Sequence, residues 1–192
     1  MGGDQGRDHR QCGNQRDRGR KMTPFEAARQ AEAADRIEEA ARQYEDGLSL
    51  NPDDIEARVD LAVLYWQATD YGVSSSRGLP KPFVAAAGKR YLELLQQGLG
   101  RFPANPVLRF WSAYTEWTDL GRRFDPSESR KLRATYPDYL EPAMYLYAVS
   151  RGTECERDAH ELLSRYRNTK TYRARYVVSV IESVAKHARS PR

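Results

Sequence analysis

The stretch EEAARQYEDGLSLNPDDIEARVDLAVLYWQATDYG, residues 38–72, indicates how the rest of the chain folds. Two segments with apolar residues at helical spacing meet in it, at Asn51-Pro52-Asp53-Asp54. A proline disfavours helical geometry in the residue before it, so the first helix ends here. The carboxylates that follow suit the start of the next helix, because the helix dipole favours negative charge at an N-terminus. The stretch therefore predicts two antiparallel helices joined by a short turn.

The same helical spacing continues from residue 23 to residue 187, and no segment alternates as a strand would. Thr23, Pro24 and Glu26 have the order of a capping box with proline at the first helical position. Asn105 and Asp125 each precede a proline in the same way, and Gly121 and Gly152 follow expected helix ends. The sequence therefore predicts an all-α protein. The expected helices span residues 23–34, 36–50, 53–69, 82–101, 106–120, 126–135, 139–151, 154–167 and 170–187.

Residues 36–69 carry a specific pattern of small and aromatic side chains. Ala40, Tyr44, Gly47 and Pro52 follow one another at intervals of four, three and five residues. This order resembles the tetratricopeptide repeat, a pair of antiparallel helices about 34 residues long. In that family, small residues let the two helices approach closely while large ones fill the grooves between them. In the next helix the resemblance continues at Leu61, Ala62 and Tyr65.

The repeat period is visible beyond this segment, although the signature weakens. Pro103 and Pro137 lie 34 residues apart. The resemblance implies a right-handed solenoid of three to four repeats, with residues 170–187 as a C-terminal capping helix over the last open edge. An irregular helical bundle is the alternative.

The chain divides into a polar tail, residues 1–21, and a repeat domain, residues 22–192. The tail has no large apolar side chain and is expected to be disordered. Met22 directly precedes the first capping signal, so we hypothesise that it is the physiological start; the rival is a basic arm for nucleic acid. Residues 70–82 are an insertion rich in Ser, Gly and Pro, expected to be a surface loop or a flap that contacts a partner.

The resemblance also implies a binding surface. Stacked helix pairs present a concave face lined by the first helix of each pair, and in this family that face binds a peptide or a partner helix. The alternative is that most of the aromatic residues pack between helices, as we expect for Trp111. The residues implied as partner-binding are Glu56, Val59, Val63, Trp66, Gln67, Arg109, Tyr114, Trp117 and Tyr145.

Charge is distributed unevenly along the chain. Residues 22–70 carry four basic and twelve acidic side chains, whereas residues 71–192 carry 21 basic and twelve acidic ones. This asymmetry leaves two alternatives to a protein-binding adaptor: a nucleic-acid-associated helical protein, or a structural unit that assembles head to tail. The basic residues considered for nucleic acid are Arg122, Arg123, Arg130, Lys131 and Arg133.

The sequence offers no pattern for catalysis. The three histidines have no metal-binding spacing, and no Gly-rich phosphate loop occurs. We therefore expect no enzyme activity, no cofactor and no metal. Two cysteines and the absence of an apolar leader predict a cytoplasmic protein, and 25 arginines against six lysines favour a GC-rich, bacterial genome. No apolar run approaches the ~18 residues of a membrane span.

Overall fold

The computed structural model describes residues 21–188, and these residues form helices with no strand among them. The all-α prediction is confirmed. The tail expected at residues 1–21 and the basic-arm alternative lie almost wholly outside the described residues. The helices are α1 (Pro24–Ala33), α2 (Ile37–Leu50), α3 (Ile55–Thr69), α4 (Tyr71–Ser76), α5 (Lys81–Arg101), α6 (Pro106–Leu120), α7 (Pro126–Thr135), α8 (Glu141–Val149), α9 (Glu156–Tyr166) and α10 (Tyr172–Ala188).

Capping residues next to the helices determine where most of the helices begin or end. Thr23 accepts a hydrogen bond from the Glu26 N–H at 3.2 Å, and the Glu26 carboxylate accepts one from the Thr23 N–H at 2.8 Å. Asn105 caps α6 by accepting from two backbone N–H groups at 3.0 and 3.1 Å. Gly121 ends α6 with a φ of 61°, a left-handed conformation that favours glycine. These ends match the predicted ones because capping is decided by residues close in sequence.

Residues 70–82 differ from the simple loop that composition suggests. Asp70 ends α3 and also caps the short helix α4, accepting from the Val73 N–H at 3.0 Å. The chain then turns through Gly78, whose φ is 62°, and enters α5. The insertion therefore contains a short helix of six residues, α4, which contacts α3.

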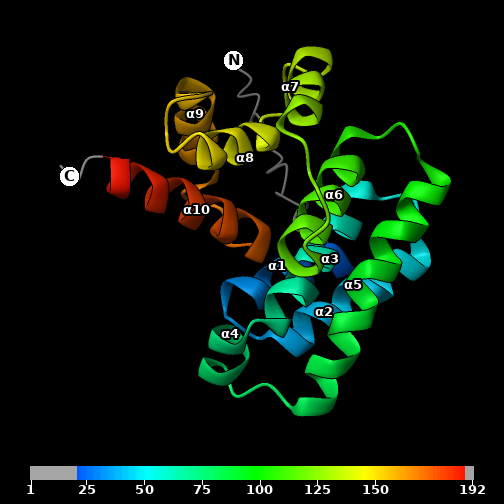
Figure 1. Ribbon diagram of the computed structural model, residues 1–192. Helices are drawn as coiled ribbons and strands as arrows, with labels where there is room; N and C mark the ends of the chain where they lie inside the picture. The colour runs from blue at the N-terminus through cyan, green and yellow to red at the C-terminus, as the bar shows by residue number, and fades with distance from the viewer. Residues whose placement is uncertain (1–20, 189–192) are drawn as a thin grey trace, which may run out of the picture.

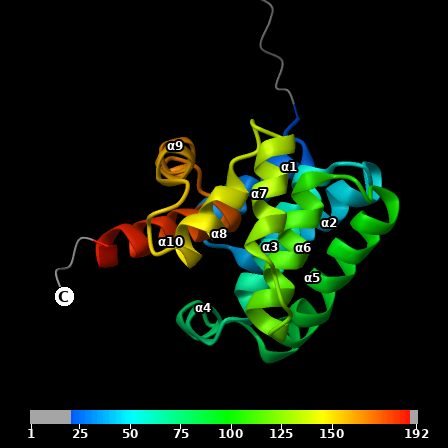
Figure 2. The ribbon, with the colours of Figure 1, turned by 45° about the horizontal axis from the view of Figure 1, so that its top comes forward.

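Neighbouring helices in the chain pack on one another, as Figures 1 and 2 show. The closest packing joins α1 to α2 and α3 to α5, and α6 lies against both α3 and α5. We call α1–α6 the first half and α7–α10 the second half. In the second half, α8 packs against α7, α9 and α10. One buried hydrophobic core runs through both halves.

The last helix packs on more than its neighbours in sequence. Besides α8 and α9, α10 contacts α3, and its first residues reach the end of α1. The sequence predicted residues 170–187 only as a capping helix over the last open edge of the solenoid. That prediction does not include these contacts with the first half of the chain. The first turns of α10 therefore join the two halves of the molecule.

Candidate functional site

One arginine of α10 lies where α3, α6 and α8 meet. The Arg173 side chain is 5% exposed, and its Nε and Nη2 atoms donate to the two carboxylate oxygens of Glu141, each at 2.7 Å. Its Nη1 atom donates to Glu56 at 2.7 Å and to Asp60 at 3.3 Å. The guanidinium carbon lies 5.7 Å from the centre of the Trp111 ring. This side chain anchors the start of α10 against three helices at once.

Glu141 is the buried partner of that arginine, with 1% of its surface exposed. It also accepts hydrogen bonds from the Trp111 indole at 2.7 Å and from the Tyr139 and Tyr166 hydroxyls at 2.8 Å each. Burial alone would raise its pKa, but the charge and hydrogen bonds of Arg173 outweigh burial and hold the pKa below 4.5. Glu141 therefore stays ionised at neutral pH, and Arg173 compensates its charge.

A second carboxylate, Glu32, meets the first residue of α10. Its side chain accepts from the Tyr172 N–H at 2.8 Å and from the Tyr44 hydroxyl at 2.6 Å, and it is fully buried. Burial raises its pKa to about 7, against the effect of these two hydrogen bonds. Burial likewise raises the pKa of Asp60 to about 6, against the attraction of Arg173. Charge at this junction therefore changes near neutral pH.

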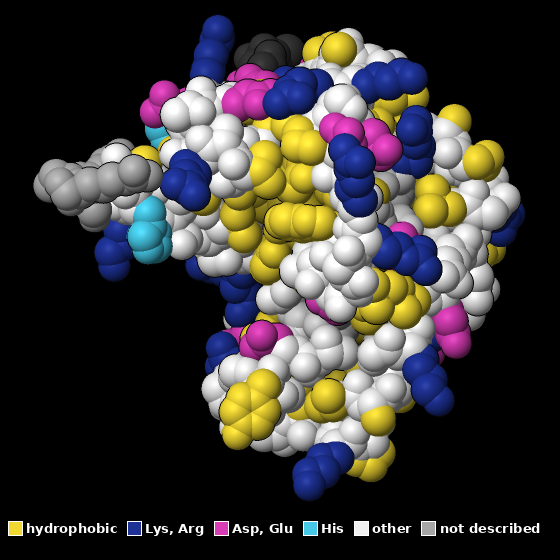
Figure 3. Space-filling view, viewed as in Figure 1, with side chains coloured by type: hydrophobic (Ala, Val, Ile, Leu, Met, Phe, Trp, Pro, Cys, Tyr) yellow, Lys and Arg dark blue, Asp and Glu magenta, His cyan; other side chains and the backbone are white. Residues whose placement is uncertain are grey.

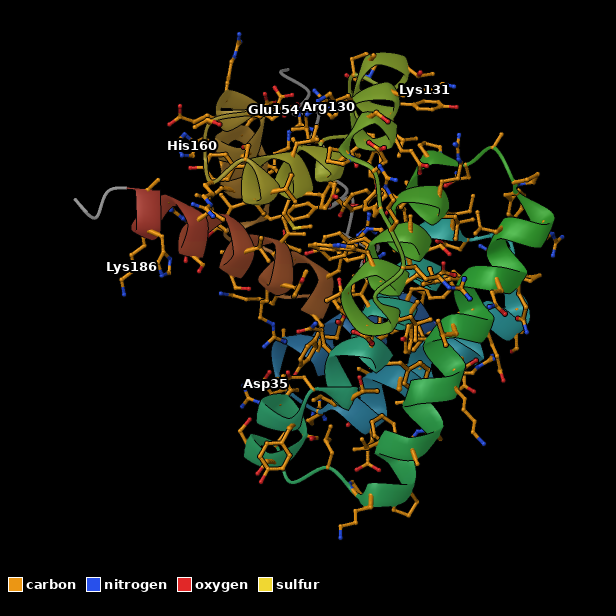
Figure 4. All side chains as sticks on the ribbon, viewed as in Figure 1. Asp35, Arg130, Lys131, Glu154, His160 and Lys186 are labelled. Atoms are coloured by element: carbon orange, nitrogen blue, oxygen red, sulfur yellow. The ribbon has the colours of Figure 1, made fainter. Side chains whose placement is uncertain are left out.

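Asp35, labelled in Figure 4, ties α10 to the turn after α4. Its carboxylate contacts Arg175 at 2.5 Å and Arg77 at 3.0 Å. The guanidinium carbon of Arg175 also lies 4.3 Å from the centre of the Tyr172 ring. The two basic side chains are thus held by one carboxylate.

We use the term inner face for the side of α3, α6 and α8 that contacts α10. An aromatic cluster runs across it, with ring centres 4.5 to 6.3 Å apart. Tyr176 of α10 joins this cluster, since its hydroxyl lies 2.7 Å from that of Tyr114. The cluster comprises Trp66, Phe110, Trp111, Tyr114, Trp117, Phe124, Tyr139, Tyr145 and Tyr176.

Five of the predicted partner-binding residues are buried. Val59 and Val63 have no exposed surface, and Tyr145 is 2% exposed, with its hydroxyl donating to the Phe124 carbonyl at 2.6 Å. Trp66 and Tyr114 are 5% and 4% exposed and both contact the Tyr176 ring. Trp111 is fully buried, in the core position expected for it.

The other four reach the surface at different places. Glu56 pairs with Arg173 at the start of α3, and Arg109 is exposed on α6. Gln67 is partly buried near the end of α3. Trp117 is 36% exposed near the end of α6, with its ring 5.2 Å from that of Tyr145. The structure thus brings Trp66, Tyr114, Trp117 and Tyr145 together and leaves Arg109 apart from them.

A pocket of about 580 Å³ opens where α10 leaves the ends of α3 and α6 uncovered. We call it the open-end pocket. Its walls come from the end of α3, the start of α4, the end of α6 and one residue of α10. In the space-filling view the surface is indented between α10 and α4 (Figure 3). The pocket is lined by Trp66, Gln67, Thr69, Asp70, Tyr71, Thr118, Asp119 and Tyr176.

Sequence reasoning missed Glu141 and Arg173. The sequence contained a signal for Arg173. This residue lies four and eight positions before Val177 and Ile181, which are both fully buried, so all three lie on the same face of α10. An arginine on the apolar stripe of a helix needs a buried acid as partner. Glu141, between Leu140 and a run of apolar residues, was the matching candidate.

In the described range, 21–188, no group of three or more His, Cys, Asp or Glu side chains is placed to hold a metal ion. None of the helices there is both long and apolar enough to cross a lipid bilayer.

The chain matches no protein-family model, no curated protein and no solved structure.

Proposed function

We propose that this chain is a non-enzymatic protein-interaction module with tetratricopeptide-like helix pairs, and that it binds a segment of another protein at the open end of the inner face. The observation that carries the proposal is the open-end pocket, which continues the aromatic cluster to the surface. Aromatic side chains are the commonest anchors of protein interfaces. Of the predicted residues, Trp66 and Gln67 line this pocket, and the partly exposed Trp117 directly precedes Thr118, another lining residue.

The close packing of the helix pairs supports the repeat interpretation. A Cβ atom on Gly47 would lie 2.3 Å from a ring carbon of Phe25, so the approach of α1 to α2 needs a residue without a side chain. On Gly98 a Cβ would lie 2.7 Å from the fully buried Leu108 of α6. Gly47 is one of the small residues on which the family resemblance rests.

The contacts of α10 support the binding mode. The inner face already accepts one helix, through the ion pair of Arg173 with Glu141 and the aromatic contacts of Tyr176. A partner segment would extend this row of contacts beyond Tyr176, over the ends of α3 and α6. Val59, Val63 and Tyr145 remain inside the core in this mode.

Ion pairing weighs against the nucleic-acid alternative. Arg130 contacts Glu154 through two hydrogen bonds of 2.7 and 2.9 Å, and Arg133 contacts Asp158 at 2.5 Å. Figure 4 shows Arg130 and Glu154 close together, with Lys131 on the same helix, α7. Cations that are already paired offer less free charge to phosphates.

A cytoplasmic location is part of the proposal and rests on the low cysteine content of the chain. The partner would be identified by affinity capture from a lysate.

The full chain would be immobilised and exposed to lysate of its source cell, with and without nuclease. Two variants remove surface rings at the open end, Trp117→Ala and Tyr71→Ala. Leu50→Ala is the matched control, because Leu50 is 79% exposed at the end of α2, outside the open-end pocket. Circular dichroism would verify that all three variants fold.

We expect a discrete protein to bind the wild type and the Leu50→Ala variant and to be lost with the open-end variants. Retention that nuclease abolishes would replace the proposal with the nucleic-acid alternative. Retention of the chain's own copies alone would favour head-to-tail assembly.

A further inference from the structure

The open-end pocket has an uneven chemical composition. It contains two carboxylates, Asp70 and Asp119, and three aromatic rings, Trp66, Tyr71 and Tyr176, but no Lys, Arg or His. A cleft lined by one sign of charge attracts ligands of the opposite sign. The composition therefore suits a positively charged group.

Each carboxylate uses one oxygen inside the protein. Asp70 Oδ1 accepts from the Val73 N–H at 3.0 Å, and Asp119 Oδ2 accepts from the Tyr91 hydroxyl at 3.0 Å. Within residues 21–188 the other oxygen of each carboxylate has no hydrogen bond or ion pair. Both side chains are fixed by a contact and keep one oxygen for a ligand.

The nearest cations in sequence are engaged elsewhere. Arg77, in the turn after α4, and Arg175, one residue before Tyr176, both contact Asp35. Arg122, three residues after Asp119, contacts Glu116. None of the three lines the pocket. The negative charge of the pocket is thus not offset by its own walls.

The rings are held in a fixed arrangement. Trp66 and Tyr176 contact edge to face, with centres 4.8 Å apart, and Tyr176 is held by its hydroxyl contact with Tyr114. Tyr71 is 84% exposed at the mouth of the pocket. A cation within about 6 Å of an aromatic face is attracted by the negative charge of that face.

The protein already binds two guanidinium groups with the same combination of groups. Arg173 lies over Trp111 and pairs with Glu141, and Arg175 lies over Tyr172 and pairs with Asp35. In both cases an aromatic ring and a carboxylate hold an arginine of α10. The open-end pocket has the ring and the carboxylates without an arginine.

We propose that the open-end pocket binds an arginine side chain of a partner protein, so that the partner segment is basic. This inference rests on the proposed function and names the chemistry of the partner. The guanidinium stacks on the rings and donates to the free oxygens of Asp70 and Asp119, which suits its planar set of donors.

The test uses the full chain and a fluorescein-labelled peptide of three Gly-Ser-Arg units, at about 0.15 M salt, where the Debye length is about 8 Å. The matched ligand replaces each arginine with citrulline, which has nearly the same shape and no charge. The site variant is Asp70→Asn/Asp119→Asn, because asparagine oxygens can still accept from the Val73 N–H and the Tyr91 hydroxyl. The control variant is Asp46→Asn/Asp138→Asn, which removes two exposed carboxylates outside the pocket.

We expect the arginine peptide to bind the wild type roughly fivefold to tenfold more tightly than the citrulline peptide, as one or two partly exposed charge contacts allow. The site variant should lose this preference, while the control variant should keep it within about twofold, since distant exposed charges are screened. Backbone amide shifts of residues 66–71 in nuclear magnetic resonance spectra should change with the arginine peptide.

Three results would overturn the inference. Equal binding of both peptides at residues 66–71 would leave peptide binding in place and remove the arginine preference. Equal loss in both variants, or no shift of these residues at millimolar peptide, would show that the pocket is not an arginine site. The lysate experiment tests the proposed function separately, because it depends on ring removal and on no choice of peptide.

Discussion

The two ends of the inner face hold the same kinds of side chain in opposite states. At the closed end, Glu141 is buried and accepts hydrogen bonds from Arg173, Trp111, Tyr139 and Tyr166. At the open end, Asp70 and Asp119 each keep an oxygen without a partner in the described chain. One set of groups therefore holds α10 in place, while each carboxylate of the other set keeps an unpaired oxygen. Substitutions should therefore change stability at the closed end and binding at the open end.

The largest expected effect is at Glu141. Glu141→Ala leaves Arg173 buried with only Glu56 and Asp60 as acidic partners, and breaking a buried ion pair destabilises by about 3–5 kcal/mol. Urea unfolding would measure the free energy of unfolding. The control is Glu154→Ala, which breaks the surface pair with Arg130 and should cost about 1 kcal/mol or less. Equal losses in the two variants would contradict the special role of the closed end.

The second prediction concerns pH. Glu32 has its pKa raised from 4.5 to about 7, so between these pH values the native state holds a proton that the unfolded state releases. The free energy of unfolding therefore falls as pH rises through this window, by about 3 kcal/mol from this group. Urea unfolding at pH 5 and pH 7.5 should show a smaller fall for Glu32→Gln than for the wild type. Glu38→Gln, on an exposed position of α2, should keep the wild-type dependence.

The third prediction concerns the contact between the Tyr114 and Tyr176 hydroxyls, which lies between the closed end and the open end. Tyr176→Phe leaves the buried Tyr114 hydroxyl without its partner and should destabilise by about 1–2 kcal/mol. Removing both hydroxyls, in Tyr114→Phe/Tyr176→Phe, should cost less than the sum of the single changes, because no polar group is then left unpaired. Additive losses in this double-mutant cycle would mean that the contact carries no coupling.

The smallest effect on stability is expected at the open end. Tyr71→Ala removes a ring that is 84% exposed, so the free energy of unfolding should change by about 0.5 kcal/mol or less. The same variant should weaken peptide binding. A thermal melt together with the peptide titration would measure both, and a large loss of stability would place Tyr71 in the core instead.

The sequence predicted the helices well because their ends depend on neighbouring residues. Thr23, Asn105 and Asp125 cap the helices for which they were chosen. The cap that begins α4 was missed, although Asp70 at its start is the same kind of signal. The four rings Trp66, Tyr114, Trp117 and Tyr145 were selected together and lie together.

The position of α10 against the other helices could not be predicted from local sequence patterns. It depends on pairs such as Tyr172 with Glu32 and Arg175 with Asp35, which are 140 residues apart. The open-end pocket needs α3, α4, α6 and α10 in place at once, so no single segment encodes it. Buried charge on an apolar stripe, as at Arg173, was the one sequence signal of this long-range packing.

The contacts between α10 and α1 have a consequence for how the chain folds. A repeat array folds locally, because each unit contacts only its neighbours. The ribosome makes α10 after every helix that it contacts, so Glu32 and Glu141 lack their hydrogen bonds from Tyr172 and Arg173 until these two residues have left the exit tunnel. Closing a loop of 140 residues raises the contact order and slows folding. Until α10 packs, Trp66, Trp111 and Tyr114 lack their contacts with Tyr176, and apolar surface that is exposed during folding promotes aggregation.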